Sequence, residues 1–87
     1  MSGHYDFLDL VIEIHAVYNY FELTKPNEHE YQEILQKIMY QIGLGCVETA
    51  LYRLRAEEHN ILQHVGRFET FWNYYWAIKK LERLVRV

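Results

Sequence analysis

Cysteine and proline are almost absent from this sequence of 87 residues, and each absence excludes a class of structure. The single cysteine, Cys46, cannot form an intrachain disulfide or a cysteine-based zinc site, which fits a reducing compartment. One proline, Pro26, and a charged fraction of only 24% argue against a disordered chain. No apolar run approaches the roughly 20 residues that span a bilayer. These features predict a single domain over residues 1–87, located in the cytoplasm.

Serine and glycine are also scarce, which removes the usual signals of catalysis. Ser2 is the only serine, and the four glycines form no phosphate-binding loop. The five histidines are dispersed without any zinc-ligand spacing. The first residues lack the basic segment and the cleavage site of a signal peptide. We therefore expect no enzyme activity, cofactor, metal or secretion signal.

Charge is distributed unequally along the chain, although the net charge is only -3. Residues 1–48 carry eight acids and two lysines, giving -6, whereas residues 49–87 carry four acids and seven lysines or arginines, giving +3. This polarity favours antiparallel packing of the two halves, either within one chain or between two chains.

Apolar residues recur at helical spacing in four segments, over about 6–23, 28–42, 46–65 and 67–85. Pro26, Gly43 and Gly66 separate the segments, with Gly43 expected as a left-handed helix cap. Asp6 is expected to cap the first helix, and Asn27 with Glu30 resembles a capping box for the second. In the second helix the polar face comprises Gln32, Glu33, Gln36 and Lys37.

The pattern predicts an all-α fold, a small four-helix up-down-up-down bundle. An alternative is a dimerising helical hairpin in which one long C-terminal helix continues through Gly66.

The first helix carries apolar residues on two faces. One face contains Leu10, Ile14 and Val17, and suits the core. The second ridge repeats every four residues and is predicted to mediate self-association, favouring a homodimer; it comprises Leu8, Ile12, Ala16 and Tyr20.

Six large rings crowd the stretch from Phe68 to Trp76, more than one stripe of a helix can bury. Helical spacing assigns an inward stripe to Phe68, Phe71, Tyr74, Tyr75, Ile78, Leu81 and Val85. Tryptophans beside cations have the composition of interface hot spots, and the predicted partner-binding residues are Trp72, Trp76, Lys79, Lys80 and Arg83.

Glu58 falls within the apolar stripe of the third helix, where a buried carboxylate would need a partner. The alternative is that Glu58 pairs with Arg55 or reaches solvent.

These patterns favour a small non-enzymatic interaction protein that binds another protein as an inhibitor, adaptor or immunity-type regulator. Phage and bacterial accessory proteins are often of this size, an analogy of size and class only. A second hypothesis is a nucleic-acid or nucleotide binder that uses Arg53, Arg55, Arg67, Lys79, Lys80, Arg83 and Arg86. A third is a ribonuclease, because Arg53 and His59 resemble the Arg-x4–6-His spacing of the HEPN family. In this chain, however, Leu54 replaces the polar residue usual after that arginine.

Overall fold

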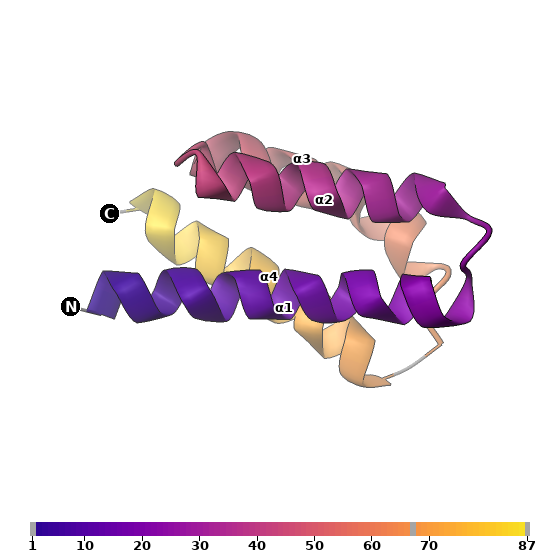
Figure 1. Ribbon diagram of the computed structural model, residues 1–87. Helices are drawn as coiled ribbons and strands as arrows, with labels where there is room; N and C mark the ends of the chain where they lie inside the picture. Colours follow the sequence, from indigo (N-terminus) through magenta and orange to yellow (C-terminus); the bar gives the residue numbers. More distant parts are fainter. Residues whose placement is uncertain (1, 67, 87) are drawn as a thin grey trace.

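The computed structural model describes residues 2–66 and 68–86, and these ranges contain four helices and no strand. The helices are α1 (Ser2–Thr24), α2 (His29–Gly43), α3 (Val47–Leu62) and α4 (Phe68–Arg86). Consecutive helices run in opposite directions, and the two chain ends lie at the same end of the molecule (Figure 1). The predicted all-α, up-down-up-down bundle is therefore confirmed.

Each helix packs against the helices that precede and follow it, and α4 closes the ring against α1. The core lies between them and consists of one cluster of buried side chains: Leu10, Ile14, Val17, Phe21, Leu35, Ile38, Ile42, Ala50, Leu51, Leu54, Ile61, Tyr74, Ala77, Ile78 and Leu81. Leu10, Ile14 and Val17, which the helical spacing of α1 assigned to the core, all belong to this cluster.

The connections differ in detail from the cap predictions. Asp6 lies inside α1, because that helix begins at Ser2. The N-cap of α2 is Glu28, without a side-chain hydrogen bond, so the Asn27 capping box does not form. Gly43 is the last residue of α2, and the left-handed position is taken by Gly45, with φ of 85°. A residue without a Cβ atom adopts this conformation at little cost.

The connection between α3 and α4 shows that the C-terminal half is not one continuous helix. Helix α3 ends at Leu62 and α4 begins at Phe68, so Gly66 lies in a connection and the long-helix alternative is wrong. The Gly66 N–H donates a hydrogen bond of 2.9 Å to the Tyr20 hydroxyl. This bond fastens the connection to α1.

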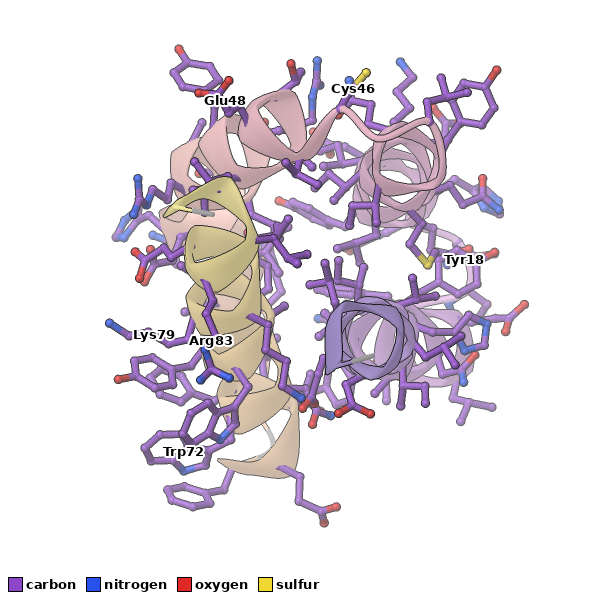
Figure 2. The ribbon with its side chains drawn as sticks, turned by 90° about the vertical axis from the view of Figure 1, so that its left-hand side faces the viewer. Tyr18, Cys46, Glu48, Trp72, Lys79 and Arg83 are labelled. Atoms are coloured by element: carbon purple, nitrogen blue, oxygen red, sulfur yellow. The ribbon has the colours of Figure 1, made fainter. Side chains whose placement is uncertain are left out.

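Helix α4 is tilted with respect to its neighbours. In Figure 2, α1 and α2 are seen end-on, whereas α4 extends along the side of the molecule. Its first turns diverge from α3 and project beyond α1 (Figures 1 and 2). This tilt means that only part of α4 is covered by the rest of the bundle.

The tilt overturns part of the predicted core. Phe68, Phe71 and Tyr75 were expected inside but are exposed. The buried face of α4 instead uses Thr70 and Ala77 beside Tyr74, Ile78 and Leu81. Small side chains at two positions permit close helix packing, which large rings at the same positions would prevent.

Two polar residues also lie where the sequence pattern did not place them. Glu58 of α3 is exposed to solvent. Of the two interpretations of Glu58, the buried carboxylate is wrong and the solvent-exposed one is confirmed, although Arg55 pairs with Glu82 and not with Glu58. Gln32, expected on the polar face of α2, is buried, and its amide nitrogen has no hydrogen-bond partner among the described residues.

Candidate protein-binding surface

Five aromatic side chains are exposed together on the outer side of α4. This α4 aromatic face consists of Phe68, Phe71, Trp72, Tyr75 and Trp76, with exposed fractions from 37% for Trp72 to 75% for Phe68. With about 200 Å² for a large ring, these fractions leave roughly 470 Å² of aromatic surface in solvent. The largest apolar patch of a typical monomer is about 300–600 Å² and is often functional.

Trp72 is the centre of this face. Its ring packs edge-on against Tyr75 at a centroid distance of 5.2 Å and against Phe71 at 5.9 Å. Phe68 approaches it at 5.8 Å and Trp76 at 6.3 Å. These mutual contacts restrict the rotamers of all five rings, so that a partner would meet a preformed surface at a small entropic cost.

Two cations border the C-terminal end of the α4 aromatic face. Lys79 places its Nζ atom 5.4 Å from the centroid of the Tyr75 ring, within the range of a cation–π interaction. Arg83 is exposed one turn further along, and Figure 2 shows Trp72, Lys79 and Arg83 on the same side of α4.

Lys80 does not belong to this surface. Its ammonium group lies 2.8 Å from the Glu13 carboxylate of α1, and both side chains are largely covered. Of the predicted partner-binding residues, Trp72, Trp76, Lys79 and Arg83 therefore lie together, whereas Lys80 connects α4 to α1.

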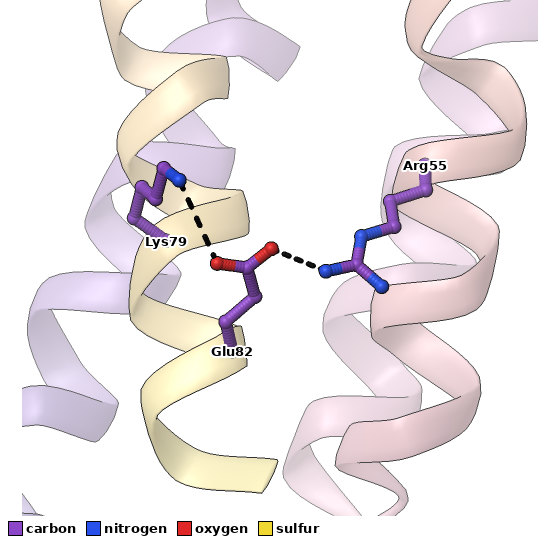
Figure 3. A network of polar contacts seen from close by, with 3 residues as sticks. All are labelled: Arg55, Lys79 and Glu82. Carbon is purple, nitrogen blue, oxygen red and sulfur yellow. Dashed lines mark hydrogen bonds and ion pairs between the residues drawn. The ribbon is translucent and has the colours of Figure 1, made fainter. Parts of the chain in front are cut away.

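Glu82 offsets part of the positive charge beside the α4 aromatic face. Its carboxylate accepts a hydrogen bond from Arg55 of α3 and lies 3.8 Å from Lys79 Nζ (Figure 3). The network connects α3 to α4 and reduces the net positive charge available to a ligand. Arg83 forms no hydrogen bond or ion pair with the described side chains of residues 8–66 and 68–85, so it is the free cation beside the rings.

The four residues of the predicted self-association ridge on α1 differ in their exposure to solvent. Leu8 and Ile12 are exposed, whereas Ala16 and Tyr20 are half-buried. The latter two line a hollow of ≈ 350 Å³ between α1 and the start of α4, where Asn73 completes the wall. The exposed remainder of the ridge is thus much smaller than the α4 aromatic face.

The other candidate groups are dispersed over the molecule. Arg53 lies on α3, and His59, near the end of that helix, is exposed and accepts a hydrogen bond of 2.7 Å from Gln63. Cys46 is exposed at the N-cap of α3. Among the side chains that the structure describes, those of residues 8–66 and 68–85, no cluster of three or more acidic, histidine or cysteine residues is placed to hold a metal ion. No helix in those ranges combines the length and apolarity needed to cross a membrane.

The positive residues proposed for nucleic-acid binding do not form one free patch. Arg55 is paired with Glu82, and Lys80 with Glu13. Arg67 and the side chain of Arg86 lie outside the described residues.

The helical spacing placed the two tryptophans outside the core of α4 but assigned the other three rings of the face to the inward stripe. A signal for them was present, because Thr70 and Ala77 are the small residues that mark the buried side of α4. Comparison of the chain with family models, curated proteins and solved structures finds no match.

Proposed function

We propose that the protein is a small non-enzymatic interaction module of the cytoplasm, an inhibitor, adaptor or regulator that binds another protein through the α4 aromatic face. The observation that supports this proposal is the exposure of five mutually packed rings around Trp72. Tryptophan and tyrosine in such clusters supply much of the free energy of protein association.

Charge favours a protein partner over a single-stranded nucleic acid, because nucleic-acid binders combine aromatic rings with a positively charged groove. The chain has a net charge of -3, and Lys79 is bordered by Glu82. Phosphate recognition depends on concentrated positive charge, which this surface lacks.

The experiment compares retention of cellular proteins by immobilised wild type, Trp72→Ala and Tyr52→Ala. Tyr52 is 75% exposed on α3, away from the face, and is the matched control. We expect proteins that wild type and Tyr52→Ala retain to be lost by Trp72→Ala. For a purified partner, we expect Trp72→Ala to weaken binding by about 30-fold, the effect of removing a hot-spot ring.

Two results would contradict the proposal. One is retention of the same partners by Trp72→Ala. The other is Trp72-dependent binding of a labelled single-stranded oligonucleotide that falls steeply between low and physiological salt, which identifies the nucleic-acid alternative. Equal far-ultraviolet circular dichroism of the three proteins establishes that a loss of binding does not reflect unfolding.

A further inference from the structure

The exposed side of α4 is complementary to the same side of a second copy that is related to it by a two-fold rotation. Along this side the rings precede the cations, in the order Phe68, Phe71, Trp72, Tyr75, Trp76, Lys79 and Arg83. All of these positions except Phe71 are spaced symmetrically about the point between Tyr75 and Trp76.

We propose that two copies of the chain pair through their α4 aromatic faces, antiparallel, about a two-fold axis between Tyr75 and Trp76. The inference deepens the proposed function, because it rests on that face being a protein-binding surface and names a second copy as an occupant. A different partner protein then competes with the second copy for the same rings.

The register follows from the spacing of the residues. In an antiparallel pair, Trp72 lies opposite Lys79 of the second copy, and Phe68 lies opposite Arg83 of the second copy. Each pair brings a cation to an aromatic ring, an attraction that strengthens as water is removed. Tyr75 and Trp76 meet at the axis and contribute apolar contact.

Charge excludes the parallel arrangement of the same faces. Parallel helices would place Lys79 against Lys79 and Arg83 against Arg83, with like charges in contact. The antiparallel register separates the two Lys79 positions by seven residues along the axis, about 10 Å. It also opposes the two helix dipoles, which favours antiparallel neighbours.

The exposed area is small for a dimer interface. Two α4 aromatic faces of roughly 470 Å² each would bury about 950 Å², near the lower limit of about 1,000 Å² for a specific interface. We therefore expect a weak dimer with a micromolar dissociation constant. The α1 ridge offers less area, because only Leu8 and Ile12 of its four residues are exposed.

Sedimentation velocity across about 1 to 500 μM protein tests the dimer, because self-association depends on concentration. We expect wild type and Tyr52→Ala to pass from monomer to dimer, and Trp72→Ala to shift the midpoint at least about 30-fold higher. Ile12→Ala, which alters the α1 ridge, should leave the midpoint unchanged. A monomer at every concentration, or a dimer lost in Ile12→Ala and kept in Trp72→Ala, overturns the inference.

Disulfide cross-linking tests the antiparallel register in a Cys46→Ser background. One preparation carries Phe68→Cys and the other Arg83→Cys, so that Trp72, Tyr75 and Trp76 remain in place. We expect oxidation of the mixture to give the mixed disulfide, because the two positions are opposite in this register. Neither preparation should cross-link alone, since two copies of position 68 lie about 22 Å apart.

Cross-linking of either preparation by itself, or a dimer that gives no mixed disulfide, overturns the register. These outcomes are distinguishable from failure of the proposed function. If the protein is monomeric but Trp72→Ala still loses the partner proteins, the dimer is refuted and the proposed function stands. If the protein dimerises but Trp72→Ala still retains the partner proteins, the proposed function is refuted and the dimer stands.

Discussion

We expect Tyr74→Phe to lower stability at neutral pH and to raise it, relative to wild type, in alkali. Tyr74 is 1% exposed in the core, and its hydroxyl donates a hydrogen bond to the Leu54 carbonyl of α3. Burial raises the pKa of the Tyr74 phenol far above its usual range, and the carboxylates of Glu58 and Glu57 raise it further. The folded protein therefore holds this phenol in its neutral form.

The magnitude follows from the hydrogen bond and from proton linkage. Loss of the bond should cost about 1 kcal/mol near pH 7. The neutral phenol contributes fully to the free energy of unfolding below about pH 10, the pKa of tyrosine in the unfolded chain. This contribution is lost as pH rises further, because only the unfolded state then releases the proton. Wild type should lose about 1.4 kcal/mol from this group by pH 11. The stability curves of wild type and Tyr74→Phe should then cross between about pH 10 and 11.

The assay is urea unfolding from pH 7 to pH 11, followed by circular dichroism at 222 nm. Tyr52→Phe is the control, because Tyr52 is exposed and its substitution should alter neither the neutral stability nor the alkaline slope. Curves for wild type and Tyr74→Phe that stay parallel through pH 11 would refute the reasoning, since they would mean that the folded state ionises this phenol as readily as the unfolded state.

Three further experiments test the packing of the bundle. Leu54→Ala removes a fully buried side chain and should lower the free energy of unfolding by about 2–5 kcal/mol; a loss under about 1 kcal/mol would contradict the buried position. Gly45→Ala should destabilise the protein by roughly 1–2 kcal/mol, because φ of Gly45 is positive. Gly43→Ala should stabilise it by about 0.4–1 kcal/mol, because Gly43 lies in α2 with open space around its Cβ position. Equal effects of the two substitutions in thermal melts would contradict the left-handed conformation of Gly45. A double-mutant cycle of Glu13→Gln and Lys80→Met should give a coupling of about 0.5–1 kcal/mol, and zero coupling would show that this pair does not join α1 to α4.

The sequence predicts the helices well where their apolar stripe is narrow. In α2, Leu35, Ile38 and Ile42 fall on one side of the helix and are all buried. Turn residues are a weaker guide, because a glycine marks a reversal without stating which residue takes the left-handed conformation. Gly43 and Gly45 illustrate this limit, since both stand at the end of α2 and only Gly45 has positive φ.

The sequence by itself determined that this chain forms four helices and that Trp72 and Trp76 lie outside the core of the last one. Only the tertiary structure decided which side of α4 is buried. A helix with rings around most of its circumference has no single preferred inward side, so that the tilt of α4 and the small size of Thr70 and Ala77 made the choice. That choice turned Phe68, Phe71 and Tyr75 to solvent and created a face of five rings where the sequence pattern had predicted only the two tryptophans beside cations.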